Sequence, residues 1–445
     1  MSTPSRDRLV ELRREFHRKP EPAWREFWTT ARVVDELESM AVDEILVGSE
    51  VLAEGERIAV PDDDELERWF RQAEDEGANP ETLERLRGGY TGAMATLERE
   101  ARGASDGASG EATDPRARGD GPTIALRVDI DGLPRPESSD DEHVPAREGF
   151  RSEHEGAMHA CGHDAHITMG LGVLEAVADS DFAGTLKVFF QPAEETIGGA
   201  KPMAESGLLN DVDYLLAVHI GLDHPTGEVV AGVGGFLAVH QFRAAFSGEP
   251  AHAGGHPNEG RNAVQAMAAA VQNLYAIPRH AEGATRVNAG DVEGGSASNV
   301  IPESARITGE VRGETTELME YMRERAHSVL EGAATMHDCD LEITPEGEAP
   351  GAESDAAVVD VVETVAGRTS GVDSVLRRDD LGGSEDATFL MKRVQDHGGL
   401  AAYVGVGTDH PGGHHTATFD VDEDSLVVGV DVLSQTVRAL ARDRP

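Results

Sequence analysis

Residues 123–134, with the sequence TIALRVDIDGLP, join an apolar strand to the carboxylates that follow it. The run Thr123 to Val128 predicts a buried strand, and Asp129 and Asp131 come directly after its end. In open α/β sheets, the ends of the strands host the functional site. This stretch therefore predicts an α/β fold with a site at one edge of its sheet.

The residues that follow repeat this pattern. Helix and strand signals alternate over 165–178, 185–190, 199–206 and 213–219. Such alternation predicts a largely parallel sheet with helices on its faces. It also predicts that His163, Glu194 and His219 lie at strand or helix ends on one edge.

The residues before the strand are less regular. Residues 5–41 predict two helices, and a region rich in Asp and Glu extends from about 54 to 102. Helical stretches at 65–73 and 80–87 predict an exposed subdomain there. Residues 101–122 consist mostly of Gly, Ser, Asp and other small or charged residues, which predicts a linker or disordered loop.

The pattern changes at about residue 238. Strands and helices are predicted at 239–246, 262–276, 286–292, 304–312, 316–336 and 340–344. Their β-α-β-β-α-β order is typical of a ferredoxin-like domain. Helix, strand and helix return from 355 to 442. We therefore expect a catalytic domain over 1–237 and 351–445, with an acidic insertion at about 50–120, and a second domain inserted over 238–350.

Composition excludes several classes of partner. The formal net charge is −44, and only four of the 39 basic residues are lysines. Nucleic acids and anionic membranes attract clustered cations, so neither is an expected partner. The acidic surface indicates a halophilic protein, with an acidic mesophilic protein as the alternative. Two cysteines, no signal peptide and no transmembrane run favour a reducing cytoplasm.

Residues 159–166, HACGHDAH, place three imidazoles, a thiol and a carboxylate in eight residues. This density favours a metal site, although a helix start with a buried cysteine is the plainer alternative. Further candidate ligands are Glu194, Glu195, His219, His414 and His415. One tetrahedral catalytic ion does not use so many ligands, so two ions are expected, with a thiolate able to bridge them. The mixed S, N and O donors suit zinc, and manganese or cobalt are alternatives.

Glu194 and Glu195 follow Phe189-Phe190-Gln191-Pro192, which suggests the end of a buried strand. On an extended backbone, adjacent side chains point in opposite directions. This geometry would suit one glutamate as a ligand and the other as a base. A solvated pair of glutamates is the alternative.

Several longer strings resemble one family. HACGHDAH, FQPAEE, GGAKPMAESG, VDYLLAVHIG and HHTATFDVDED are similar to motifs of the desuccinylases, aminoacylases and auxin-conjugate hydrolases. These metal-dependent enzymes cleave amide bonds beside a free carboxylate. RREFHRKPEPAWREF, the 50–100 insertion, HAEGATRVNAGDVEGGSASNVIPESA and GGSEDATFLM resemble the subgroup that hydrolyses p-aminobenzoyl-glutamate.

The resemblance implies a role for each matching residue of the catalytic domain. The implied metal ligands are Cys161, His163, Glu195, His219 and His415. His415 is chosen over His414 because only His415 has a Phe and a Glu at the family's offsets. Glu194 is the implied base, Asp131 is implied to orient a ligand, and Asp164 and His166 are implied to support the ligands. A loop carboxylate that caps a turn is the alternative for Asp131.

The inserted domain resembles the family's lid and dimerisation domain. His252 matches a histidine that stabilises an oxyanion in the site of a neighbouring subunit. Asn299 and Arg312 match positions that bind the oxyanion or carboxylate of the substrate. The alternatives are a turn residue for Asn299 and a solvated strand end for Arg312.

We therefore expect a metal-dependent amidohydrolase that cleaves N-acyl or N-aroyl amino acids. Glu194 would deprotonate the attacking water and then serve the leaving amine. The first substrate to test is p-aminobenzoyl-glutamate, and a general aminoacylase or small dipeptidase is the alternative. A catalytically silent metal-binding relative is a further alternative. The resemblance also implies a homodimer, or a heterodimer with a homologous subunit.

Overall fold

The computed structural model describes residues 4–100, 121–410 and 412–445. The chain forms two compact units. The larger unit comprises residues up to 234 together with 353–381 and 386–445, and the smaller unit comprises 235–352 and 382–385. All but the last two residues of the predicted linker, 101–122, lie outside the described residues.

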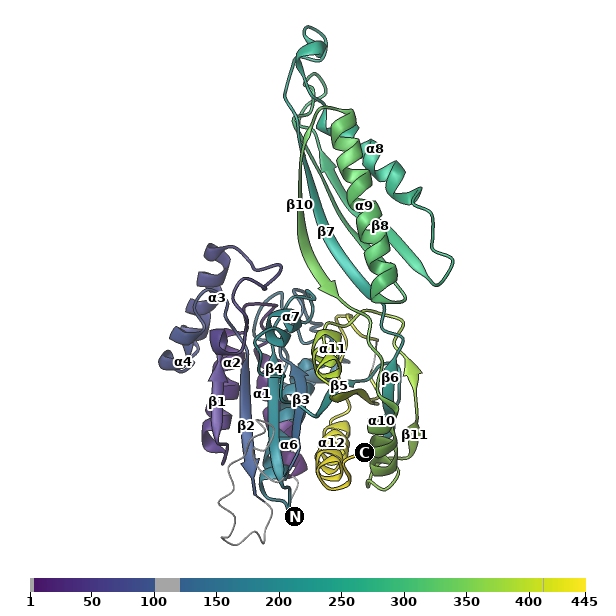
Figure 1. Ribbon diagram of the computed structural model, residues 1–445. Helices are drawn as coiled ribbons and strands as arrows, with labels where there is room; N and C mark the ends of the chain where they lie inside the picture. Colours follow the sequence, from purple (N-terminus) through teal and green to yellow (C-terminus); the bar gives the residue numbers. More distant parts are fainter. Residues whose placement is uncertain (1–3, 101–120, 411) are drawn as a thin grey trace, which may run out of the picture. The chain divides into compact units, whose positions relative to one another are not determined.

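A mixed sheet of nine strands forms the centre of the larger unit in the described part of the chain (Figure 1). In spatial order its strands are β1 (Glu44–Val47), β2 (Ala93–Arg99), β4 (Gly184–Gln191), β3 (Thr123–Asp129), β5 (Tyr214–Ile220), β13 (Leu400–Val406), β6 (Glu228–Gly234) and β11 (Ser374–Leu376), with β12 (Asp379–Asp380) also on β6. The pairs β4–β3, β3–β5 and β5–β13 are parallel, whereas β1–β2, β2–β4 and β13–β6 are antiparallel. The predicted α/β class with a mostly parallel sheet is confirmed.

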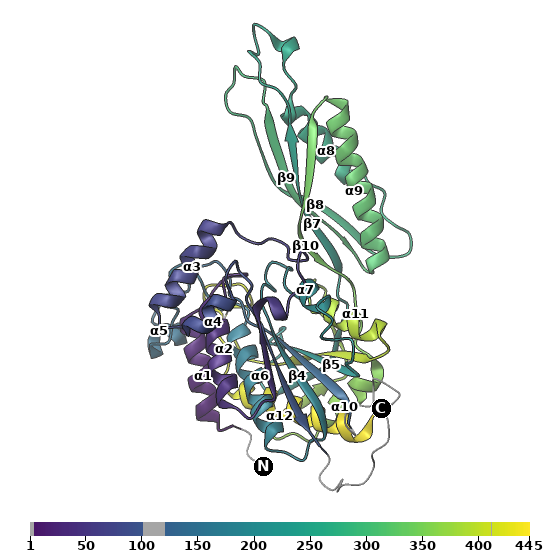
Figure 2. The ribbon, with the colours of Figure 1, turned by 60° about the vertical axis from the view of Figure 1, so that its left-hand side comes forward.

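Helices cover this sheet because its central strands are apolar on both faces. Every residue of β5 is buried, as are all but the first residue of β3. Helix α6 (His163–Ala178) packs with α1 (Arg6–Arg18) and α12 (Asp424–Asp443), and α12 packs with α10 (Ala356–Ala366) (Figure 2). Helices α7 (Ala200–Ala204) and α11 (Thr388–Asp396) pack together, and α11 contacts β5 and β13. Among the described helices, none is long and apolar enough to cross a membrane.

The acidic region differs from its prediction. Its helices α3 (Asp63–Asp75) and α4 (Pro80–Arg85) form as expected, but they pack on α2 (Phe27–Ser39). Their apolar residues, including Leu66, Phe70 and Leu83, belong to the main core. Residues 93–99 form β2 within the large sheet. The expected exposed subdomain is therefore wrong for this region, because its amphipathic helices bury their apolar faces against the larger unit.

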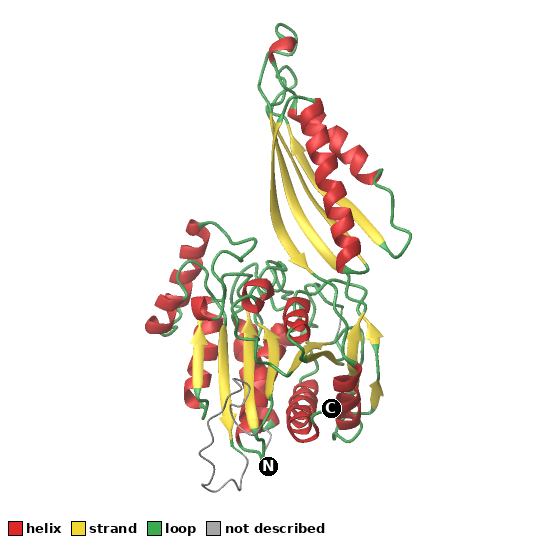
Figure 3. Ribbon diagram, in the orientation of Figure 1, coloured by secondary structure: helices red, strands yellow, loops and turns green. Residues whose placement is uncertain are grey.

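The smaller unit has an antiparallel sheet in the order β10 (Asp340–Ala349), β7 (Ala238–Ser247), β9 (Ser304–Gly313) and β8 (Thr285–Gly294). Helices α8 (Ala263–Tyr275) and α9 (Thr316–Met336) pack on it (Figure 3). Alternate residues of β7, such as Phe242 and Phe246, are buried in the core of this unit. The predicted β-α-β-β-α-β order is confirmed for this segment.

Three short helical segments complete the described structure: η1 (Gly48–Glu50), α5 (Val144–Glu148) and η2 (Pro257–Glu259).

Candidate metal centre

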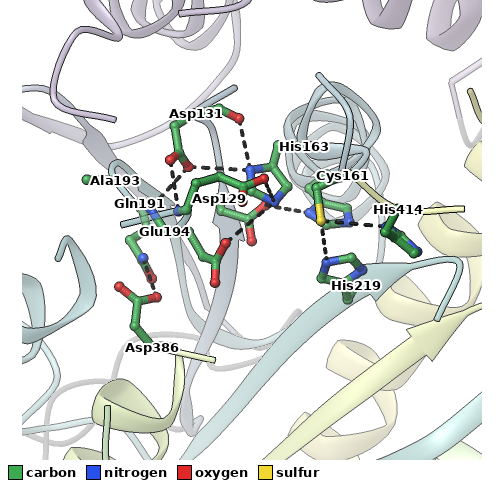
Figure 4. A network of polar contacts seen from close by, with 12 residues as sticks. Asp129, Asp131, Cys161, His163, Gln191, Ala193, Glu194, His219, Asp386 and His414 are labelled. Carbon is green, nitrogen blue, oxygen red and sulfur yellow. Dashed lines mark hydrogen bonds and ion pairs between the residues drawn. The ribbon is translucent and has the colours of Figure 1, made fainter. Parts of the chain in front are cut away.

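The candidate site lies where three parallel strands of the larger unit end. The register pairs Asp129 at the end of β3 with Gln191 at the end of β4, and it pairs Arg127 with Ala217, two residues before His219. The carboxyl ends of parallel strands meet at one edge of a sheet, so these strands deliver Asp129, Glu194 and His219 to a common place. Figure 4 shows their side chains converging with that of His163.

Cys161 and His163 enter this cluster from the turn that starts α6. Gly162 between them has φ +87°, and a Cβ there would lie 2.5 Å from Cγ2 of Ile220. Glycine is thus required for both the conformation and the space. The sulfur of Cys161 lies 3.5 Å from Nε2 of His219. The turn therefore supplies a thiol and one imidazole, which form a group with His219 from β5.

Main-chain carbonyls orient the two buried imidazoles. Nδ1 of His163 donates to the carbonyl of Asp131 at 2.9 Å, and Nδ1 of His219 donates to the carbonyl of Ile220 at 2.7 Å. Each ring therefore turns Nε2 toward the cluster, which is the orientation of metal-bound histidines. Nε2 of His163 is buried without a hydrogen bond in the described structure. Carboxylate oxygens of Glu194 and Glu195 lie 3.9 Å from it.

The pKa values at the site agree with a ligand set that needs a cation. Burial, with the nearby His166 and His414, holds the pKa of His219 well below its usual value. Burial and the negative charge of Glu195 raise the pKa of the Cys161 thiol well above its usual value. A divalent cation would reverse the second effect, because it stabilises a thiolate directly. The residues therefore fit a metal.

The loop that carries Glu194 and Glu195 is not extended as predicted. Ala193 has φ +55°, so the chain turns immediately before the pair. The main-chain N–H groups of Glu194 and Glu195 donate to the two oxygens of Asp131, at 3.1 and 3.0 Å. The prediction that the two side chains point in opposite directions is wrong, since both reach the same nitrogen of His163. The turn at Ala193 is the physical reason.

Both histidines of the C-terminal motif lie at the cluster. Nδ1 of His414 is 3.6 Å from the sulfur of Cys161, and its Nε2 accepts the N–H of Leu222 at 3.2 Å. Nε2 of His415 lies 3.5 Å from Glu195, and the His415 side chain is 57% exposed. Cys161, Glu195 and His415 form one of the groups that could hold an ion. Nε2 of His414 is thus engaged by the main chain, whereas the choice of His415 as a ligand stays a prediction.

Asp129 completes a second group, with His163 and His166. Nε2 of His166 accepts the N–H of Ile220 at 2.8 Å, so its Nδ1–H faces Asp129, with which it forms a very short contact. Arg127 pairs with the other oxygen of Asp129 at 2.8 Å. No motif in the sequence assigned a role to Asp129, although its position at the end of the first strand was the available signal.

Asp164 points away from the cluster, into a buried network. It accepts from Nε of Arg13 at 2.7 Å and contacts Nδ1 of His17 at 2.8 Å. Burial and the charge of Arg13 lower the pKa of His17, but hydrogen bonds to Asp164 and Glu137 outweigh them and raise it to about 9. This network ties the start of α6 to α1. The string RREFHRKPEPAWREF contains Arg13 and His17, but the sequence assigned no supporting role to them or to Glu137.

Of the three candidate residues of the smaller unit, His252 and Asn299 lie close together, and Arg312 lies apart from them. Nδ1 of the exposed His252 accepts the N–H groups of Gly254 and Gly255, at 3.1 and 2.9 Å. The carbonyl of Asn299 accepts from Ala253 at 2.9 Å, which places Asn299 beside the His252 loop.

Arg312 lies on β9, at the end of the smaller unit's sheet that is far from the His252 loop. It pairs in register with Val239, whereas Ser304 at the other end of β9 pairs with Ser247. Eight residues of strand separate the two ends, a distance of about 27 Å. The guanidinium of Arg312 forms two bonds with Glu310, at 2.8 and 3.0 Å. A single small substrate therefore cannot contact both His252 and Arg312 of one smaller unit.

Known proteins resemble this chain over most of its length. The family model "Peptidase family M20/M25/M40" matches residues 125–439. Over 432 residues the chain is 40% identical to one of the subunits of the p-aminobenzoyl-glutamate hydrolase of Escherichia coli (strain K12), covering 96% of this chain and 95% of that protein. It is also 40% identical over 432 residues to indole-3-acetyl-aspartic acid hydrolase of Enterobacter agglomerans, with coverages of 96% and 94%. The crystal structure of an aminobenzoyl-glutamate utilization protein from Klebsiella pneumoniae matches with a TM-score of 0.80 at 34% identity, covering 98% of this chain and 97% of that one.

Proposed function

The chain belongs to peptidase family M20/M25/M40 and is a hydrolase of amide bonds, and from this premise we propose its substrate class and the roles of its residues. The substrates are amides that join an aromatic acyl group to an acidic amino acid, with p-aminobenzoyl-glutamate as the first candidate. The family is metal-dependent. The observation that carries the proposal is the convergence of Cys161, His163, Glu194, Glu195 and His219 at the carboxyl ends of three strands.

Two divalent ions, zinc or manganese, would be held by Cys161, His163, Glu195, His219 and His415. When bound, such ions polarise the amide carbonyl and lower the pKa of water. The chain's own contribution is to fix each donor. Main-chain carbonyls orient His163 and His219, and the carboxylate of Asp131 holds the N–H groups of the glutamate pair. Asp131 therefore acts as a positioning residue in this proposal.

Glu194 is the proposed general base. Its carboxylate lies 3.9 Å from Nε2 of His163, and its side chain is only 12% exposed. From this place it would accept a proton from the attacking water and return it to the nitrogen of the leaving amine. The expelled product is then a free amino acid, and the acyl group leaves as a carboxylic acid.

The substrate class is inferred from the two relatives and from one cation. Both relatives are named for an aromatic acyl group joined to an acidic amino acid, glutamate in one and aspartate in the other. The pKa of His415 is lowered mainly by burial, then by the charge of His163 and by that of Arg135. Arg135 therefore lies near His415. The buried Nε of Arg135 has no hydrogen-bond partner within the described structure. We propose that Arg135 binds the side-chain carboxylate of the acidic amino acid in the substrate.

The residues of the smaller unit are proposed to contact substrate and not metal. Because Nδ1 of His252 accepts two main-chain N–H groups, its Nε2 carries the proton and can donate to an oxyanion. Asn299 would act beside it, and Arg312 would bind a carboxylate. The separation between the His252 loop, at one end of the sheet, and Arg312, at the other end of β9, supports a site in which they come from two copies of the chain. The proposed assembly is a homodimer, or a heterodimer with a homologous subunit.

The test is a substrate panel with metal analysis. Purified protein loaded with Zn²⁺ or Mn²⁺ is expected to release amine from p-aminobenzoyl-glutamate faster than from p-aminobenzoyl-alanine or a dipeptide. Arg135→Gln should raise KM for the glutamate conjugate and leave the alanine conjugate unchanged. Preference for neutral acyl amino acids would favour a general aminoacylase. Metal binding without turnover of any substrate would indicate a catalytically silent relative.

A further inference from the structure

Glu26 is a buried carboxylate at the start of α2 that lies beside the loop of the proposed base. It is fully buried, and Oε1 accepts the main-chain N–H of Ala193 at 2.8 Å. Oε2 accepts from the hydroxyl of Thr91 at 2.7 Å. Glu26 lies in the string RREFHRKPEPAWREF, but its distance in sequence from residue 193 explains why the sequence assigned it no role.

Glu26 is available for this contact because another residue caps its helix. It occupies the N-cap position of α2 but makes no capping bond with its side chain. Glu21 caps the helix instead, because its two oxygens accept the N–H groups of Trp28 and Thr29, at 3.0 and 2.8 Å. The Glu26 side chain can therefore extend away from α2 and toward the loop.

The N–H group that Glu26 accepts belongs to the residue that turns the chain. Ala193 has φ +55°, a left-handed conformation that costs about 1 kcal/mol or more for a residue with a Cβ. This conformation directs Glu194 and Glu195 toward His163. Three successive N–H groups, those of residues 193, 194 and 195, thus donate to two buried carboxylates, Glu26 and Asp131.

We propose that Glu26 is a positioning residue that holds the left-handed turn at Ala193, so that Glu194 and Glu195 are correctly placed for base catalysis and metal binding. This inference rests on the proposed function of those two glutamates. The carboxylate acts as a hydrogen-bond acceptor, and its charge is not needed. Burial, and then the negative charge of Asp131, raise the pKa of Glu26 to about 8, in keeping with a role for the acceptor oxygen.

The test compares Glu26→Ala, Glu26→Gln and Thr91→Val. Loss of the acceptor in Glu26→Ala should weaken binding of Zn²⁺ or Mn²⁺ and lower kcat by about 10- to 100-fold, with KM little changed. The amide oxygen of Glu26→Gln can still accept the N–H of Ala193, so affinity and kcat should stay within about threefold of wild type. Thr91→Val removes only the second bond of Glu26 and should give an intermediate loss.

The matched control is Glu21→Ala, which removes a buried carboxylate that accepts two N–H groups but does not bond to residues 192–195. Its melting temperature should fall while metal affinity and kcat are kept. Equal loss in Glu26→Gln and Glu26→Ala would overturn the proposal, because charge would then be the active property. Loss in Glu26→Ala no greater than in Glu21→Ala would also overturn it. Wild-type protein that binds metal but cleaves no substrate would refute the proposed function. The role of Glu26 could still be tested, because metal affinity of the variants is measured without substrate.

Discussion

The candidate residues of the two units differ in how firmly the fold holds them. In the larger unit, His163, His219 and the glutamate pair are mostly buried, and main-chain or carboxylate partners fix their orientation. In the smaller unit, His252 and Asn299 are exposed on a loop. A metal site needs preorganised donors, whereas a residue that stabilises a developing charge needs only to reach it. Under the proposed function, metal binding would belong to the larger unit, and the smaller unit would contribute to turnover alone.

Replacement of the base should greatly reduce turnover without loss of metal. Glu194→Gln removes the proton acceptor while its main-chain bond to Asp131 remains, so kcat should fall by about 10²- to 10⁴-fold with bound metal unchanged. Steady-state kinetics and metal analysis of the same sample measure both quantities. Loss of metal from Glu194→Gln would move this residue into the ligand set.

Replacement of the thiol should separate metal loss from a general effect on folding. Cys161→Ala is expected to lower bound metal per chain and to abolish turnover, while the melting temperature of the apoprotein changes little. Cys339→Ala is the control, since Cys339 lies in the smaller unit beside Asp340. Equal metal content and activity in wild type and Cys161→Ala would show that the thiol is not a ligand.

Replacement of His252 tests the proposed role of the smaller unit in turnover. His252→Ala should lower kcat by about 10²- to 10³-fold without loss of metal, because an oxyanion donor is removed. Mixing it with Glu194→Gln should restore activity if the two residues act across a dimer. Random exchange makes half the dimers mixed, each with one intact site, so about a quarter of wild-type activity is expected. Without recovery despite demonstrated exchange of partners, His252 would act within its own chain or not at all.

The buried network around His17 predicts a pH-dependent contribution to stability. The pKa of His17 is raised to about 9 in the folded protein from an ordinary 6.5, so its contribution is complete below pH 6.5 and is lost as pH rises through 9. The unfolding free energy of wild type should exceed that of His17→Gln by about 3 kcal/mol at pH 6, and this difference should shrink toward pH 9.5. Denaturant titrations at both pH values measure it. A constant difference would contradict a charged His17.

Salt should have a smaller and more distributed effect. The net charge of −44 predicts that the melting temperature rises from low to molar KCl, as repulsion between acidic groups is screened. The ligands of the metal centre are mostly buried and should respond little. A flat melting temperature across the series would argue against halophilic adaptation and would leave the metal centre unaffected.

The sequence predicted the elements of the fold well and the geometry of the site in part. Apolar periodicity located β3, β5 and α6, because those segments are buried over nearly their whole length. It missed β2, whose residues 93–99 follow an acidic region that resembled an exposed insertion. The spacing within HACGHDAH correctly predicted that Cys161 and His163 lie in one cluster. It did not reveal the turn at Ala193, which is bonded to Glu26, a residue 167 positions away in the chain. Long-range hydrogen bonds leave no periodic signal.

The most direct test of the division between the two units is the bound metal per chain in His219→Ala and His252→Ala, measured side by side with wild type after identical loading with Zn²⁺. We predict a clear loss of metal in His219→Ala and wild-type content in His252→Ala, although both variants should be nearly inactive. Full metal content in His219→Ala, or loss of metal in His252→Ala, would contradict the assignment of the metal centre to the larger unit.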